Sequence, residues 1–120
     1  MKGVIRGFHI QRPPYEQTKY LWVVHGEIVD ISFPLNDSRP NDSDIVYERL
    51  HADGHGIVIP SNYAHSYQTI SETSLVIYIC IGAYSPQHEV SINPLSLGID
   101  WPITPSIISK KDLAGLSFQE

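Results

Sequence analysis

The sequence has little cysteine and little positive charge. Cys80 is the single cysteine among 120 residues, which excludes a disulfide within the chain and favours a cytoplasmic location. Eight Lys and Arg residues against thirteen Asp and Glu give a formal net charge of -5. Because basic residues adjoin only at Lys110 and Lys111, neither nucleic acid nor a membrane surface is an expected partner.

Long hydrophobic and helical segments are also absent. No stretch has the length and apolarity of a transmembrane helix, and no signal-peptide pattern opens the chain. No segment keeps a 3.6-residue apolar period over helical length, and the closest candidate is a short turn over 110–116. The length suits one hydrophobic core, so we expect a single domain over residues 1–120.

Short apolar segments separated by turn residues make up most of the chain. The expected strands are 4–10, 20–24, 27–33, 45–50, 56–59, 67–70 and 75–81. Such strands, with turn signals every eight to twelve residues, predict an all-β sandwich or barrel. Cys80 is expected in the core of this barrel as a small apolar residue. The tail from Asn93 is rich in proline and apolar residues, so it is expected to pack irregularly on the barrel.

The segment from Gly3 to His9 is the first candidate for chemistry. Arg6 and His9 are three residues apart, so a regular strand would put them on opposite faces. Gly7 permits a kink or bulge that brings both side chains to a shared cavity. Arginine can hold a phosphate with two hydrogen bonds, and histidine can transfer a proton near neutral pH. Lys19 adds a second cation ten residues later.

The residues alone leave open the roles of a histidine, a tyrosine and a glutamate farther along the chain. The run from Pro60 to His65 approximates the second metal motif of cupin barrels, Pro-x-Gly-x-x-His. The first cupin metal motif is broken because Ile10 and Gln11 follow His9, so no catalytic metal is expected. Tyr78 is either a core aromatic or a phenol that faces a cavity and donates a proton. Glu89 taken alone is a solvated loop acid.

Several motifs in order along the chain support a more specific identification. The segment from Gly3 to His9 is followed by Pro13-Pro14, Gln17 and Lys19. Four more runs are Val23-Val24-His25-Gly26-Glu27-Ile28-Val29-Asp30, Ile59-Pro60 with Ala64-His65, Tyr84-Ser85-Pro86-Gln87-His88-Glu89, and Leu97-Gly98-Ile99-Asp100-Trp101-Pro102 with Ile108-Ser109-Lys110-Lys111-Asp112. Together they resemble the dTDP-4-dehydrorhamnose 3,5-epimerase family. That resemblance implies a cupin-type double-stranded β-helix, or jelly-roll barrel.

The resemblance assigns roles to six residues. His9 falls on the general base, and Tyr78 falls on the general acid at the opposite face of the substrate. Arg6 falls on a substrate-binding arginine, and Lys19 falls on the lysine near the sugar carbonyl. The two further substrate-contacting positions are His65 and Glu89. The implied function is cofactor-independent epimerisation of a nucleotide-linked 4-keto-6-deoxy sugar, by proton removal and return beside the keto group.

Two departures from the family pattern define the alternatives. Family members have several dozen residues before the motif that begins here at Gly3. They also have an aspartate near the tail that pairs with the base, and no acid lies between Ile92 and Leu97, so His9 is expected to lack that partner. One alternative is therefore an enzyme with another sugar or a single inverted carbon. The other is a non-catalytic sugar- or nucleotide-binding cupin. Open sheet edges predict a homodimer in either case.

Overall fold

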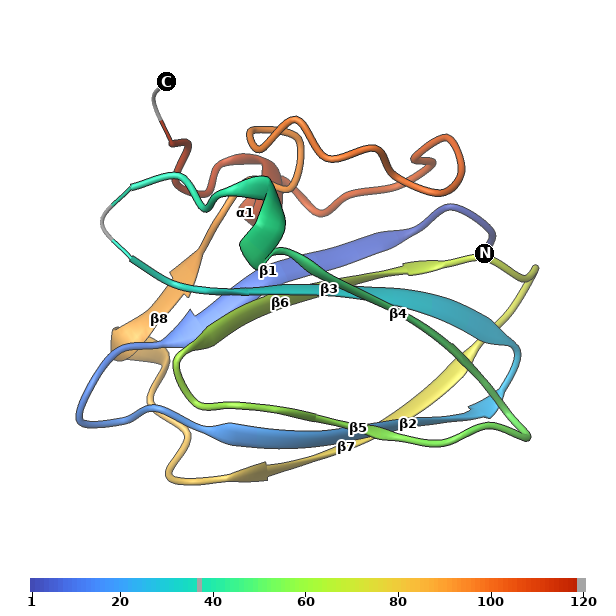
Figure 1. Cartoon of the computed structure of the whole chain (residues 1–120), viewed down its shortest axis with the longest axis horizontal. Coiled ribbons are helices and arrows are strands. Elements are labelled where there is room, and N and C mark those ends of the chain that lie inside the picture. Colours follow the sequence, from blue (N-terminus) through green and yellow to red (C-terminus); the bar gives the residue numbers. More distant parts are fainter. Residues whose placement is uncertain (37, 119–120) are drawn as a thin grey trace.

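A computed structural model describes residues 1–36 and 38–118, and two antiparallel β-sheets face each other in it (Figure 1). One sheet has five strands in the order β4-β3-β6-β1-β8, and the other has three in the order β5-β2-β7. The strands are β1 (Ile5–Gln11), β2 (Thr18–His25), β3 (Glu27–Pro34), β4 (Val46–His51), β5 (Ile57–Ile59), β6 (Tyr63–Thr69), β7 (Leu75–Ile81) and β8 (Glu89–Ser91). This arrangement confirms the expected all-β barrel.

The five-stranded sheet is covered on both faces, which explains why β3 and β6 are buried along almost their whole length. Alternation along a strand sends successive side chains to opposite faces. On β3, Ile28 packs with Leu21 and Val23 of β2 in the space between the two sheets. Its neighbour Val29 belongs to a second apolar cluster on the other face. The barrel interior and the outer face therefore have separate cores.

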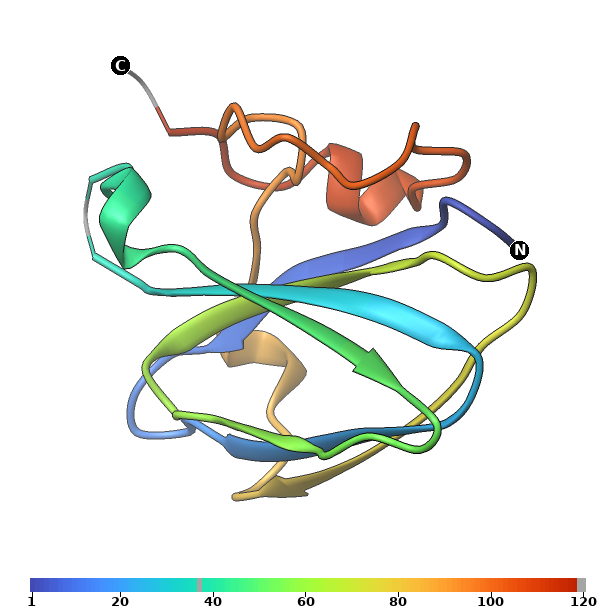
Figure 2. The same cartoon turned by 45° about the vertical axis from the view of Figure 1, so that its right-hand side comes forward.

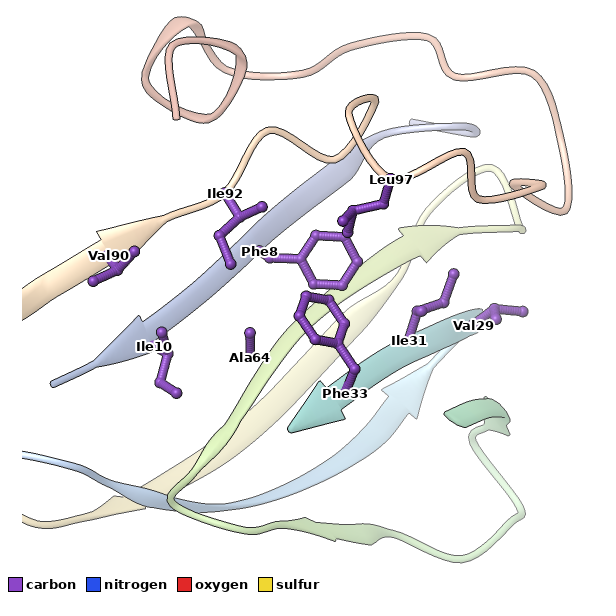
Figure 3. Close-up of a cluster of buried hydrophobic side chains, with 9 residues drawn as sticks. All are labelled: Phe8, Ile10, Val29, Ile31, Phe33, Ala64, Val90, Ile92 and Leu97. Carbon is purple, nitrogen blue, oxygen red and sulfur yellow. The ribbon is translucent and has the colours of Figure 1, made fainter. Parts of the chain in front are cut away.

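The C-terminal tail forms the cover over the outer face of the five-stranded sheet (Figure 2). Figure 3 shows Phe8 of β1 and Phe33 of β3 below Leu97 of the tail, and the two rings lie 5.1 Å apart between centroids. Trp101 also packs on Phe8, with their ring centroids 6.1 Å apart. This packing confirms the prediction that the tail from Asn93 packs irregularly on the barrel. Near its end the tail forms α1 (Lys110–Leu113), a single turn that lies against β1 (Figure 2).

Gly7 interrupts the regular pairing of β1 with β6. The register shifts between Gly7 and His9, and Gly7 has a φ of 112°, in the region that favours glycine. A Cβ atom there would lie 2.6 Å from the carbonyl oxygen of His65. The irregularity lets Arg6 and His9 line one cavity while Phe8 points into the outer core. The predicted kink is confirmed.

Two strand predictions were wrong. β6 begins at Tyr63, four residues before the expected start, so His65 lies within the strand. β8 was taken for a loop, because three residues are too few for a periodic signal, and it exists through its pairing with β1. The short turn expected near Lys110 is α1, of four residues.

Within the described part of the chain, no helix has the length and apolarity needed to cross a membrane.

Candidate functional site

A cavity of about 340 Å³ opens between the two sheets beside α1. Five of the six predicted site residues line it: Arg6, His9, Lys19, His65 and Tyr78. A second cavity of about 310 Å³ shares His9, Lys19 and Tyr78 with the first and adds the sixth residue, Glu89. The two cavities are therefore lobes of one site, with three residues common to both.

Strand register explains why residues distant in sequence meet here. His9 on β1 is the direct neighbour of His65 on β6. Across the barrel, Lys19 on β2 pairs with Cys80 on β7, and Tyr78 lies two residues earlier on the same face of β7. The five-stranded sheet thus supplies imidazoles, while the three-stranded sheet supplies an amine and a phenol.

His9 has a carboxylate partner, contrary to the sequence expectation. Its Nε2 lies 2.6 Å from Oδ1 of Asp112, whose side chain is 5% exposed. The other oxygen, Oδ2, accepts a hydrogen bond from the backbone N–H of Gly7 at 3.2 Å. A carboxylate accepts hydrogen bonds, so Nε2 of His9 carries the proton and Nδ1 is left with its lone pair. Asp112 thereby selects the tautomer in which His9 can act as a base through Nδ1.

The prediction that this partner is missing was wrong, because the carboxylate lies downstream of residues 92–97. The carboxylate is in α1, and it reaches His9 because the tail folds back over the five-stranded sheet. Ser109 caps this turn through its Oγ, which accepts a hydrogen bond from the Asp112 N–H at 3.1 Å. The available signal was the motif from Ile108 to Asp112, which the sequence comparison matched without assigning its aspartate a role.

His65 forms a second imidazole–carboxylate pair in the same cavity. Its Nδ1 lies 2.9 Å from Oδ2 of Asp30, which is 1% exposed. Burial raises the pKa of Asp30 above its ordinary value, although the hydrogen bond and charge of His65 act in the opposite direction. Sequence reasoning noted Asp30 only as part of a strand motif. Its role became visible through pairing of β3 with β6.

Lys19 is a half-buried cation of the site. Burial lowers the pKa of its amine below the ordinary lysine value, against smaller opposing effects of Cys80, Glu89 and Asp30. An ammonium that is partly withdrawn from water interacts with a negative charge that develops nearby more strongly than in bulk water. Lys19 is thus suited to hold an oxyanion.

The position of Tyr78 decides between a core aromatic and a phenol that faces a cavity. Its side chain is 55% exposed and lines both lobes, so it is not a core aromatic. The prediction for Cys80 was wrong, since Cys80 is exposed and lines the smaller lobe. At this end of β7 the inner face of the three-stranded sheet borders the cavity instead of the apolar core.

Glu89 is engaged with a residue that the sequence analysis did not single out. Its carboxylate accepts a hydrogen bond from Nζ of Lys111, the residue before Asp112. This bond raises the pKa of Lys111. Lys111 itself lines the larger lobe. Among the residues that the structure describes, no three His, Cys, Asp or Glu side chains are grouped to hold a metal ion.

Comparison with known proteins gives one consistent family. The family model described as dTDP-4-dehydrorhamnose 3,5-epimerase matches residues 1–120. A curated protein of that name from Shigella flexneri is 32% identical over 120 residues, which cover 98% of this chain and 66% of the relative. The chain spans about 60% of a Mycolicibacterium smegmatis relative with the same name, at 30% identity over 99% of this chain.

Solved structures agree with the sequence comparisons. The crystal structure of dTDP-4-dehydrorhamnose 3,5-epimerase from Sulfolobus tokodaii superposes with a TM-score of 0.85 and 42% identity, covering 97% of this chain and 65% of that one. This structural similarity confirms the cupin-type barrel.

Proposed function

Because the chain belongs to the dTDP-4-dehydrorhamnose 3,5-epimerase family, we propose that it epimerises a nucleotide-linked 4-keto-6-deoxy sugar beside the keto group. The observation that carries this proposal is the His9–Asp112 pair, which lines one cavity together with Tyr78 and Lys19. Inversion of a carbon next to a carbonyl needs a base, an acid and a group that stabilises the enolate oxygen. The residues of the cavity provide all three.

Proton removal is the step assigned to His9. Its Nδ1 takes the acidic hydrogen from C3 or C5 of the sugar, and the positive charge that forms on the ring is stabilised by Asp112. The electron pair of the broken C–H bond moves into the adjacent carbonyl, giving an enolate. Return of a proton from Tyr78 to the other face of the same carbon inverts it. His9 and Tyr78 come from opposite sheets, which suits delivery to opposite faces.

Two groups are assigned to the enolate oxygen. The ammonium of Lys19 attracts the developing negative charge. The His65–Asp30 pair can also hold the enolate oxygen if the pair carries two protons. One proton then lies between Nδ1 of His65 and Asp30, and the second is on Nε2, which donates it to the oxygen in a hydrogen bond. Burial raises the pKa of Asp30 and so favours retention of that extra proton. This route uses acid–base chemistry alone and calls for no redox cofactor or metal.

Arg6 is assigned to the diphosphate of the substrate. It lines the larger cavity and also a neighbouring polar hollow between the ends of β1 and β7. A guanidinium at this position can hold two phosphate oxygens at once. A relative from Legionella pneumophila was solved in complex with dTDP-4-keto-L-rhamnose, at 32% identity and a TM-score of 0.83. That complex supports a nucleotide sugar as the substrate class, and the single cysteine favours a cytoplasmic location.

The experiment that tests this function is deuterium exchange in heavy water. A dTDP-linked 4-keto-6-deoxy sugar is incubated with the protein, and deuterium at C3 and C5 is followed by NMR or mass spectrometry. Incorporation with inversion is expected for the wild type, and His9→Ala is expected to abolish it at both carbons. Wild-type protein that binds the nucleotide sugar without any exchange would instead favour the non-catalytic binding protein.

We expect activity to fall at alkaline pH because of Lys19. Burial lowers the pKa of this amine, so it loses its positive charge at a lower pH than an exposed lysine with the ordinary value of 10.5. The enolate is then stabilised less, so kcat/KM declines as the pH rises through this lowered pKa. Lys19→Arg keeps its charge throughout and should retain part of the activity without this alkaline limb. If Lys19→Arg shows the same alkaline fall in kcat/KM as the wild type, a group other than Lys19 causes that fall.

A homodimer is proposed through the outer face of the three-stranded sheet. Six large apolar side chains there are 40% to 55% exposed: Tyr20, Val58, Leu75, Ile77, Ile79 and Ile81. Soluble monomers seldom expose a continuous apolar surface of more than a few hundred Å². β7 is also an edge strand of this sheet, and edge strands are commonly protected by a partner. A second copy covers both the face and the edge.

Sedimentation velocity at micromolar concentration tests this surface. The wild type is expected to sediment as a dimer, and Ile79→Lys as a monomer, because a charge would be buried in the interface. Tyr47→Lys is the matched control, since Tyr47 is 51% exposed on β4 of the other sheet. A dimer that survives Ile79→Lys would place the interface elsewhere.

A further inference from the structure

Two loops that are distant in the sequence border the smaller lobe of the cavity. One joins β1 to β2 over residues 12–17, and the other joins β7 to β8 over residues 82–88. Gln17 of the first loop and Tyr84 of the second line the lobe. Tyr84 is 73% exposed, so neighbouring side chains do little to hold its ring. The position of this ring therefore depends on how the backbone of its loop is held.

The side-chain amide of Gln11 joins the two loops. Its Nε2 donates hydrogen bonds to the carbonyl of Tyr15 at 2.7 Å and to the carbonyl of Ala83 at 3.0 Å. Its Oε1 accepts a hydrogen bond from the backbone N–H of Ser85 at 3.0 Å. Gln11 is 6% exposed, so its amide is largely shielded from water. Because Ala83 and Ser85 are the two neighbours of Tyr84, the amide holds the backbone on both sides of that ring.

The chemistry of a primary amide suits this contact better than that of other side chains of similar length. The carbonyls of Tyr15 and Ala83 need two N–H donors, and the N–H of Ser85 needs an acceptor. An amide offers both on one planar group. A glutamate at position 11 has no donor for the carbonyls, and a leucine has neither donor nor acceptor. Either replacement therefore leaves backbone groups of both loops without this partner.

Other contacts hold the two ends of the second loop. Gln17 donates a hydrogen bond from Nε2 to the carbonyl of Gly82 at 3.1 Å. The backbone N–H of Arg12 donates to the carbonyl of His88 at 2.8 Å. Neither bond involves the side chain of Gln11. Loss of its amide therefore releases the centre of the loop while both ends stay attached.

We propose that Gln11 is a positioning residue that holds Tyr84 beside the smaller lobe and thereby raises the affinity for substrate. This inference rests on the proposed function, in which His9, Lys19 and Tyr78 act on the reacting ring where the two lobes meet. The part of the substrate that extends into the smaller lobe then contacts the aromatic ring of Tyr84. The chemical step does not use that contact, so Gln11 affects binding more than catalysis.

Steady-state kinetics separate an effect on binding from an effect on the base. Gln11→Leu is expected to raise KM for the dTDP-linked 4-keto-6-deoxy sugar about tenfold and to change kcat less than about twofold, because one aromatic contact is displaced. Gln11→Glu should act in the same direction, since it also loses both donors. A fall in kcat with an unchanged KM would show that Gln11 acts on His9 of the same strand, and would overturn the proposal. Unchanged kinetics would overturn it as well.

A double variant tests whether Gln11 acts through Tyr84. Tyr84→Ala removes the ring, so addition of Gln11→Leu should raise KM no further. Additive losses would contradict the proposal, because they would give Gln11 a role separate from that ring. Gln17→Leu is the matched comparison, since it removes one amide bond at the end of the same loop. It is expected to raise KM less than Gln11→Leu does.

NMR of the backbone amides tests the positioning without substrate. The Ser85 N–H is expected to be protected from hydrogen exchange in the wild type and unprotected in Gln11→Leu, and the order parameter of the Tyr84 amide should fall in that variant. The Arg12 N–H, which binds the far end of the loop, should stay protected. A Tyr84 amide that is as rigid in Gln11→Leu as in the wild type would contradict positioning.

Calorimetric affinities keep this inference separate from the proposed function. If the wild type binds the nucleotide sugar but catalyses no exchange, the proposed function fails, and an approximately tenfold weaker Kd in Gln11→Leu still supports the role of Gln11. An unchanged Kd in that variant would overturn it.

Discussion

Asp112→Asn is expected to lower the exchange rate at C3 and C5 by about 10²- to 10⁴-fold, the range associated with loss of general base catalysis. The backbone N–H of Gly7 donates to the Asp112 side chain, so the amide oxygen of an asparagine takes that position and its NH₂ group faces His9. An NH₂ group donates, which forces Nε2 of His9 to become the acceptor. The proton then moves to Nδ1, and the base loses the lone pair that it needs.

Measurement of deuterium incorporation by Asp112→Asn gives the result directly. Asp112→Glu is a useful companion, because a longer carboxylate keeps the acceptor chemistry and alters only its reach. We expect it to retain more activity than Asp112→Asn. Substrate affinity should be little changed in both, since Asp112 is assigned to His9 and not to the substrate. Nearly normal exchange in Asp112→Asn would show that His9 does not depend on this tautomer.

The second large effect is expected from Tyr78→Phe. The variant keeps His9 with its carboxylate and the cation of Lys19, so proton removal continues. It lacks the phenolic hydroxyl that returns a proton to the opposite face. The enolate is therefore reprotonated by His9 on the original face, and the carbon exchanges without inversion. We expect epimerised product to fall by about 10²-fold or more while deuterium exchange falls much less.

Separate assays distinguish the two outcomes for Tyr78→Phe. Loss of substrate hydrogen reports proton removal, and the stereochemistry of the product reports its return. Elimination products are a further sign that the enolate persists. Equal losses of exchange and inversion would contradict the role of Tyr78 as acid. Tyr84→Phe is a suitable control for removal of a hydroxyl, because Tyr84 lines only the smaller lobe.

Local sequence features were sufficient to predict most of the barrel and part of the site. Short apolar segments between turn residues located six strands near their observed positions, and Gly7 indicated the irregularity that brings Arg6 and His9 together. These features depend on neighbours within a few residues. The association of His9 with Lys19, Tyr78 and His65 was inferred from the family resemblance, since spacing alone does not specify which strands pair.

The remaining features depend on contacts between distant segments. Asp112 reaches His9 because an apolar tail without regular structure folds over the sheet, and no local pattern specifies where such a tail ends. Asp30 appeared as one residue of a strand motif, and its partner His65 was known only after β3 paired with β6. The exposure of Cys80 has the same origin. An apolar strand does not reveal which part of its inner face borders a cavity.

The proposed base and its carboxylate are separated by 103 positions in the chain, and this spacing has a consequence for biosynthesis. During translation His9 is made long before Asp112, and the eight strands of the described residues are complete before α1 is synthesised. A nascent chain can therefore form the barrel while the imidazole still lacks its acceptor. Protease cleavage between Ile99 and Ser109 would recreate that immature state in a finished molecule. On the proposed role of His9 as base, catalytic competence therefore depends on a turn that is made after the eight described strands, and it is lost when that turn is detached.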